Sequence, residues 1–269
     1  MNHLLREHAP ITDAGWREID SEARERLKPA LAARRLVDFA GPHGWEYPGP
    51  PLGRVDDIPD ESVEGVQAQQ RRVLPVVELR APFTVARAEL RDLERGAVDI
   101  DLEALDAAAQ RIAVAENLAV FHGLGAADIS GIAEVSTHPS VPMSLRDADS
   151  YPTYVARAVE MLLSAGIDGP YGLALGPECY TQVVETTERG GYPLLDHLRK
   201  ILGGPLVWAP GVNGAVAVSL RGDDFLFDAG QDLSVGYDHH DADDVHLYLE
   251  ESFAFRVATP EAAVALPVE

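Results

Sequence analysis

Cysteine and lysine are scarce in this 269-residue sequence. Cys179 is the only cysteine, which excludes an internal disulfide and a zinc module built from several thiolates. A single thiol is also typical of a reducing compartment. Lys28 and Lys200 are the only lysines, so almost every cation is an arginine, whose planar guanidinium group suits bidentate ion pairs.

The sequence also has few positively charged residues and no long apolar run. Lys and Arg total 22 against 44 Asp and Glu, so the formal net charge is −22. An acidic surface repels phosphate backbones and anionic lipids, so we expect neither nucleic acid nor a membrane as a partner. No stretch approaches the roughly 18 apolar residues that span a bilayer, and the charged N-terminus has no apolar signal region. We therefore expect a soluble, cytoplasmic protein.

The sequence does contain both helical and strand periodicities. Apolar residues at three- and four-residue steps predict helices over 12–31, 101–121, 152–165 and 194–202, with another opening at Pro177. Pro29 is expected to kink or break the first helix. Short or alternating apolar runs predict strands at 34–39, 206–208, 215–220, 225–227, 233–237 and 245–257. Because helices and strands do not alternate regularly, the predicted fold class is α+β.

A Pro- and Gly-rich segment at 41–51 introduces a predicted arm. Two extended stretches follow, 52–58 and 63–79, around the turn residues 59–62. The outer half of this hairpin has too few large apolar residues to build a core of its own. Its open edges would invite pairing with another chain, so we interpret it as an intersubunit arm.

The sequence contains no complete constellation of residues for a metal or catalytic site. His239, His240 and Asp243 are ligand types that zinc, manganese or iron accept. Adjacent histidines on a strand point apart, however, and an acidic tract between strands is usually a solvated turn. We therefore predict no bound metal there.

The remaining reactive residues lack the context that chemistry requires. Ser130 lacks the first glycine of a hydrolase motif, and the glycines at 123 and 125 follow a helix rather than a strand. Cys179 near a predicted helix start could have a lowered pKa, but a buried apolar role is the simpler interpretation. Three histidines have no second ligand at helical spacing: His122, His138 and His197. The sequence therefore predicts no enzyme.

A series of short blocks resembles the encapsulins, the linocin- or bacteriocin-like shell proteins. Gly44-Trp45-Glu46-Tyr47, followed by 51–53, resembles the entry to their extended E-loop. The other blocks, in chain order, are 9–12 with Trp16, 34–38, 78–84, 93–96, 168–171, 230–237 and 247–255. The resemblance therefore covers almost the whole chain.

The resemblance implies the tailed-phage major capsid fold of the Hong Kong 97 type. Its implied parts are an N-terminal helix with the start of the P-domain (1–43), the E-loop (44–80), the P-domain with its spine helix (81–128), the A-domain (129–223) and a return to the P-domain (224–269). The implied function is self-assembly into an icosahedral encapsulin nanocompartment. Such a shell encloses a cargo enzyme, a dye-decolourising peroxidase or a ferritin-like protein, through the cargo's C-terminal targeting peptide.

The resemblance also assigns the pocket that binds this peptide on the inner face of the shell. The matching residues are Leu27, Arg34, Val37 and Asp38, with Leu233 or Val235 as the facing wall. Apolar anchors would fill the groove while Arg34 and Asp38 bond the polar groups of the peptide. Alternatively, Arg34 and Asp38 pair with each other at a packed corner.

The resemblance also implies a pore, but it does not imply a cofactor. The residues that match the loop around the five-fold pore are Glu188, Arg189, Gly190, Gly191 and Tyr192. Members that bind flavin carry an aromatic residue after 83–84. This chain has Val85-Ala86-Arg87-Ala88 there, so no flavin is expected.

Two other functions stay open at this point. One is an enzyme, either a metal-dependent hydrolase that uses His239, His240 and Asp243 or a peptidase. The other is a phage major capsid subunit, against which the acidic balance argues because phage heads package DNA.

Overall fold

The structure is a computed structural model that describes residues 3–59, 66–187 and 191–269. The α-helices are α1 (Asp13–Ala30), α2 (Arg87–Glu94), α3 (Glu103–His122), α4 (Ile132–Val135), α5 (Tyr151–Ser164), α6 (Pro177–Glu185) and α7 (Leu194–Leu202). The 3-10 helices are η1 (Arg6–His8), η2 (Ala33–Arg35), η3 (Gly125–Ala127), η4 (Ala148–Ser150) and η5 (Pro260–Ala262). Both helices and sheets are present, which confirms the α+β class.

The strands form a main sheet, a second sheet and an arm. They are β1 (Asp38–Ala40), β2 (Pro51–Ile58), β3 (Ala68–Val73), β4 (Val77–Ala86), β5 (Tyr171–Leu175), β6 (Leu206–Trp208), β7 (Ala215–Ser219), β8 (Phe225–Ala229), β9 (Ser234–His240), β10 (Asp244–Val257) and β11 (Ala263–Leu266). The main sheet has the order β1-β8-β10-β4, with β9 also pairing with β10. The second sheet has the order β11-β7-β5-β6, and β2 pairs with β3.

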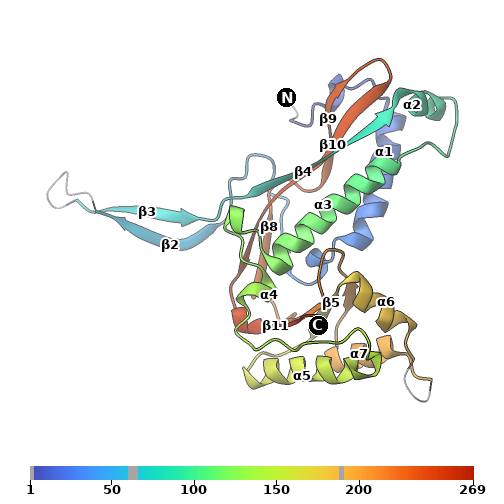
Figure 1. The fold of residues 1–269 in the computed structure, drawn as a ribbon. Helices are drawn as coiled ribbons and strands as arrows, with labels where there is room; N and C mark the ends of the chain where they lie inside the picture. Colours follow the sequence, from blue (N-terminus) through green and yellow to red (C-terminus); the bar gives the residue numbers. More distant parts are fainter. Residues whose placement is uncertain (1–2, 60–65, 188–190) are drawn as a thin grey trace.

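The long strand β10 organises the main sheet. Its first ten residues pair antiparallel with β4, and its other edge pairs first with β9 and then with β8. α3 runs along this sheet with α1 beside it, whereas α5, α6 and α7 gather around the second sheet (Figure 1).

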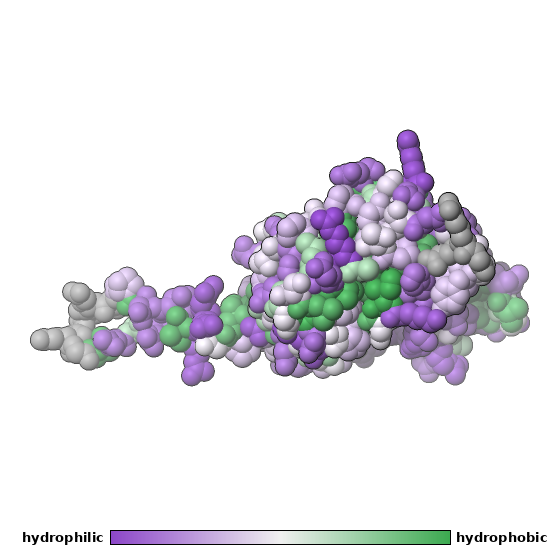
Figure 2. Space-filling view, turned by 90° about the horizontal axis from the view of Figure 1, so that it is seen from below, coloured by the Kyte–Doolittle hydropathy of each residue, from purple (hydrophilic) through white to green (hydrophobic). Residues whose placement is uncertain are grey.

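The arm formed by β2 and β3 projects away from the rest of the chain (Figure 1). Its surface mixes hydrophilic and hydrophobic residues along its length (Figure 2). Val55, Ile58 and Val73 are 50%, 44% and 55% exposed, so the arm buries little apolar surface against its own chain. The arm is shorter than the sequence indicated, because the chain leaves it after Val73 and enters the main sheet at Val77. Most of the expected turn at 59–62 lies outside the described residues.

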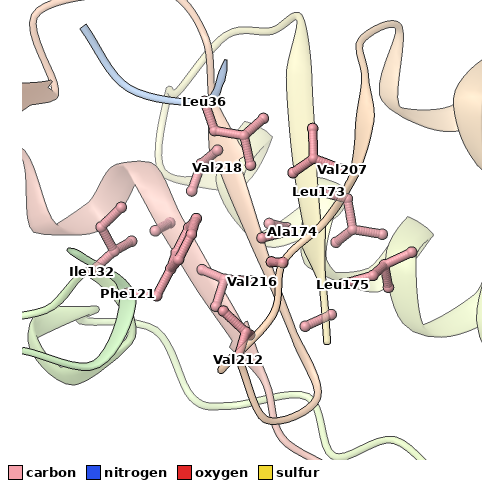
Figure 3. Packing of buried hydrophobic residues seen from close by; sticks show 14 of the residues in the cluster. Leu36, Phe121, Ile132, Leu173, Ala174, Leu175, Val207, Val212, Val216 and Val218 are labelled. Atoms are coloured by element: carbon pink, nitrogen blue, oxygen red, sulfur yellow. The ribbon is translucent and has the colours of Figure 1, made fainter. Parts of the chain in front are cut away.

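Two clusters of buried apolar residues make up the core. The larger cluster surrounds the second sheet, where Phe121 of α3 and Ile132 of α4 pack beside Val216 and Val218 of β7 (Figure 3). The smaller cluster lies between α1, α3, β4, β9 and β10. The segments that pass from one cluster to the other include the chain after α1, the middle of α3, the connection from β8 to β9, and β10 between Leu249 and Phe253.

Two predictions about local structure differ from the structure, and two strands were not predicted. α1 has no break at Pro29 and ends one residue later, at Ala30. The helix tolerates Pro29 because the carbonyl that loses its backbone donor belongs to Glu25, an exposed residue one turn earlier. The strand expected at 34–39 is split into η2 and β1. The sequence analysis also missed β5 and β11, two short strands with mostly buried residues and no alternation to reveal them.

Candidate functional site

A groove of about 500 Å³ lies between α1 and the start of β9. Apolar side chains form much of its lining: Ala23, Leu27, Leu31, Leu233, Val235 and Leu249. The polar residues of the lining are Arg6, Asp20, Arg24, Lys28, Arg34, Asp232 and Ser234. The groove thus combines apolar walls with several charged side chains.

The periodicity of α1 creates one side of the groove. Thr12 caps the helix, its Oγ1 accepting the Gly15 N–H at 3.3 Å. One stripe, which includes Ile19 and Ala23, is buried in the smaller cluster. The adjacent stripe, with Arg24 and Lys28 one turn apart, borders the groove. One stripe of α1 therefore packs in the core, and the adjacent stripe lies at the groove.

Arg34 lies at the inner end of the groove and is enclosed by carboxylates. Its Nε donates to Glu116, its Nη1 to Asp232 and its Nη2 to Glu251, each at 2.6 Å. The Arg34 side chain is only 14% exposed, and its guanidinium group lies 5.1 Å from the centre of the Phe39 ring. All three guanidinium nitrogens therefore have an acceptor within this chain.

Glu116 and Glu251 are fully buried carboxyl groups that share this one arginine. Burial raises the pKa of Glu251 well above its usual value, and the nearby Glu116 raises it further, while Arg34 opposes both effects. Burial also raises the pKa of Glu116. The pKa of Arg34 is raised as well, because the attraction of Glu116 and Glu251 outweighs its burial. Arg34 is thus the central cation of the group, and removing it would leave buried carboxyl groups without a counter-charge.

Asn117, the neighbour of Glu116 on α3, fixes the turn that carries Arg34. Its Oδ1 accepts the N–H groups of Ala32 and Ala33, and its Nδ2 donates to the carbonyls of Ala30 and Pro210. These bonds satisfy the Ala30 carbonyl at the end of α1 and the N–H groups at the start of η2. Arg34, Glu116, Asn117 and Glu251 lie where the two apolar clusters meet, and we call them the polar seam.

The structure brings four of the six predicted docking residues to one groove. Leu27, Arg34, Leu233 and Val235 line it. Val37 packs against the larger cluster and is not part of the lining.

Asp38 also lies outside the groove, where its Oδ2 accepts the Asp223 N–H at 2.7 Å. The alternative in which Arg34 pairs with Asp38 is wrong, because both side chains bond other groups. Arg34 lies in the turn η2, whereas Asp38 begins β1, so their closeness in sequence does not bring their side chains together.

The sequence analysis missed Glu116 and Glu251, although both left a signal. Glu116 falls on the same helical stripe as Ala109, Ile112 and Val120, which are buried. Glu251 follows the alternation of buried apolar residues in the first half of β10. A charged residue in an apolar pattern indicates a buried ionic partner.

Only part of the predicted pore loop is described. Glu188, Arg189 and Gly190 lie outside the described residues. Gly191 has φ +80°, and the Tyr192 ring lies 4.7 Å from the Lys200 ammonium group.

The residues considered for enzymatic chemistry do not converge. His239 stacks on His246 with ring centres 4.1 Å apart, whereas His240 Nδ1 is 2.6 Å from the Tyr237 hydroxyl. Within residues 3–59, 66–187 and 191–269, no three His, Cys, Asp or Glu side chains are placed to hold a metal ion. Burial raises the pKa of the Cys179 thiol, which is 1% exposed and so suits a core role.

No helix in the described parts of the chain is long and apolar enough to cross a membrane. The segment considered for a flavin forms the end of β4 and the start of α2, with Val85 buried in the smaller cluster.

Sequence relatives match the chain almost end to end. The Linocin_M18 family, described as an encapsulating protein for peroxidase, matches residues 1–254. A type 1 encapsulin shell protein from Rhodospirillum rubrum is 48% identical, over 99% of this chain and 96% of its own. Those from Brevibacterium linens and Rhodococcus erythropolis are 44% and 43% identical, over 99% of this chain and 99% and 100% of their own.

Solved structures share the fold at much lower sequence identity. A virus-like particle protein from Pyrococcus furiosus has a TM-score of 0.61 at 19% identity, covering 93% of this chain and 98% of its own. A chain from Mycobacterium phage Bobi has a TM-score of 0.58 at 14% identity, covering 89% and 91%. These likenesses confirm the Hong Kong 97 type of capsid fold and carry no more than the fold.

The relatives that share 40–48% of their residues with this chain are named as shell proteins, not for a catalysed reaction. The hypotheses of a hydrolase or peptidase are therefore wrong. The chain belongs to the encapsulin family, as a structural subunit of a capsid-like protein shell.

Proposed function

We propose that the shell encloses a cargo enzyme whose short C-terminal targeting peptide binds in the groove between α1 and β9. The single observation that carries this proposal is the groove itself, where apolar side chains from α1, β9 and β10 face an open space of about 500 Å³. An apolar groove with a few polar groups at its border suits a short peptide with apolar anchors.

The proposed cargo is a peroxidase or a ferritin-like protein. The description of the family, an encapsulating protein for peroxidase, supports the first of these. The shell is proposed to be an icosahedral particle in the cytoplasm, with 188–192 around the five-fold pore, and to need no cofactor of its own. Its groove is proposed to face the interior, where enclosed cargo can reach it.

Arg34 takes a different part in this proposal from the one that the resemblance implied. Three of its five N–H groups donate to Glu116, Asp232 and Glu251, which already balance its charge, so Arg34 mainly supports the groove rather than attracting the peptide. Asp232 immediately precedes the groove residue Leu233, whose N–H it accepts at 2.8 Å. Arg34 thus holds the wall that Leu233 and Val235 form.

Cargo loading tests the proposal. Shells are produced together with the peroxidase or ferritin-like protein encoded beside the shell gene, and the cargo per shell is measured after purification. Leu31→Asp and Leu233→Asp each place a charge on a partly buried lining residue without emptying the core. We expect each to lower loading at least about tenfold, because a buried charge disrupts an apolar contact, and to leave the particles intact in electron micrographs.

Leu163→Asp is the matched control, because Leu163 is 54% exposed on α5 and does not line the groove. It should load like the unchanged shell. Unchanged loading in both groove variants would remove the groove from the docking site. A monomer or small oligomer in light scattering of the unchanged protein would contradict the particle itself.

A further inference from the structure

The groove carries a surplus of positive charge on a strongly acidic chain. Its lining holds four cations, Arg6, Arg24, Lys28 and Arg34, but only two carboxylates, Asp20 and Asp232. The chain as a whole carries a formal charge of −22. Among the lining residues the cations therefore outnumber the carboxylates, and any cation there that lacks a partner would attract anionic groups.

Two of the four cations are already neutralised. Arg6 binds Asp20 at 2.8 Å, and Arg34 binds Asp232 together with the buried Glu116 and Glu251. Neither guanidinium group is left to provide most of the attraction for an incoming anion.

Arg24 and Lys28 are the cations that remain. Both are exposed, and they lie one helical turn apart on the groove side of α1. Within the described residues, neither makes an ion pair or a hydrogen bond from its side chain. Glu25, three positions before Lys28, borders a separate hollow with Pro29 and Trp208 instead.

We propose that Arg24 and Lys28 select targeting peptides that carry a carboxylate beside their apolar anchors. The apolar side chains of such a peptide would contact Leu27, Leu31 and Leu233, and its Asp or Glu side chain would lie at the border of α1. This inference rests on the proposed docking function, and it adds the chemical class of the peptide. An acidic peptide gains affinity there, and a basic one loses it.

Designed cargo tests this selection in assembled shells. A monomeric fluorescent protein is given a C-terminal tail with two leucines separated by two, three or four alanines. Each spacing is made in three forms, with Asp, Asn or Lys flanking the leucines. Shell and cargo are produced together, and fluorescence per shell protein is measured in the particle fraction. We expect loading to fall in the order Asp, Asn, Lys, by about two- to fivefold per step, as exposed ion pairs give.

Variants of the shell assign the effect to the two cations. Arg24→Gln with Lys28→Gln should abolish the order, and Arg24→Glu with Lys28→Glu should reverse it. Arg17→Gln is the matched control, because Arg17 is an exposed arginine on α1 outside the groove lining. It should keep the order of the unchanged shell.

The outcomes separate the selection from docking. Equal loading of the Asp, Asn and Lys tails, with all of them lost in Leu233→Asp, would overturn the selection and leave the docking site in place. Loading of no tail at any spacing would contradict docking of short apolar peptides, and the selection with it. An order that survives Arg24→Glu with Lys28→Glu would exclude these two cations.

Discussion

The arm and the polar seam place residues in opposite ways. In the arm, the apolar side chains of Val55 and Val73 are 50% and 55% exposed. In the seam, the carboxyl groups of Glu116 and Glu251 are fully buried. Each region holds groups that are unfavourable without a partner. The seam has its partner, Arg34, in the same chain, and we propose that the arm finds its partner in another copy. Assembly and subunit stability should therefore depend on different residues.

The largest effect is expected from breaking the arm. Val55→Asp with Val73→Asp replaces two exposed apolar side chains by charges, and the loss recurs at each contact of a symmetric particle. We expect assembly to be abolished, because burying these charges costs more than the valine contacts contribute. Light scattering and electron microscopy measure the loss of particles, and far-ultraviolet circular dichroism should show an unchanged content of helix and strand.

Val98→Asp provides the control for the arm variant. Val98 is 92% exposed and lies in the loop between α2 and α3, outside the arm. Its change to a charge should leave the particles intact. If the arm variant forms particles as readily as the unchanged chain, the arm is not needed for assembly.

The second largest effect is expected from removing Arg34 from the seam, which should lower the free energy of unfolding. Arg34→Ala removes the cation that three carboxylates share and leaves Glu116 and Glu251 buried without it. We expect a loss of about 3–5 kcal/mol, the usual result of breaking a buried ion pair. Urea unfolding in the Val55→Asp, Val73→Asp background measures it on separate subunits, without the stabilisation that assembly adds.

Arg34→Lys serves as a conservative variant for this measurement, and Arg24→Ala serves as its control. Lysine restores the charge but not the three-way geometry of the guanidinium group, so it should recover only part of the loss. Arg24→Ala removes an exposed arginine near the same groove and should change the free energy of unfolding by less than about 0.5 kcal/mol. A similar loss for Arg34→Ala and Arg24→Ala would contradict the structural role of Arg34.

Local patterns predicted most of the fold and part of the site. The bounds of α7 and β6 follow directly from the periodicity of their apolar residues and from the glycines that end α7. The arm was recognised from its lack of apolar residues. β5 could not be found in this way, because a strand buried on both faces has no alternation.

The groove residues also divide into those that local patterns predict and those that they do not. Leu27, Leu233 and Val235 follow patterns of local burial, and the resemblance placed them correctly beside one another. The position of Asp38 was predicted wrongly because the chain turns through η2, which contains Arg34, and the neighbouring residues do not reveal that turn. The three partners of Arg34 come from positions 82 to 217 residues away, a separation that a single sequence cannot resolve.

The smallest expected effect is a pH dependence that belongs to the seam and not to the arm. Burial and Glu116 raise the pKa of Glu251 above its usual value of 4.5, so the folded state keeps a proton that the unfolded chain has lost. The contribution of this group to stability is therefore complete below about pH 4.5 and is lost as the pH rises through the folded pKa. Glutamine resembles the protonated carboxyl group and cannot ionise.

Glu251→Gln should consequently flatten the dependence of stability on pH. Measured by urea unfolding in the arm-variant background from pH 4.5 to 8, the advantage of the unchanged chain over Glu251→Gln should shrink steadily as the pH rises. Glu18→Gln, at an exposed carboxyl group on α1, is the control. Parallel curves for Glu251→Gln and its parent would mean that Glu251 is ionised throughout, with Arg34 neutralising it despite its burial. Curves that converge as the pH rises would show that Glu251 keeps a proton in the folded state at low pH. Arg34 would then face fewer than three ionised carboxylates.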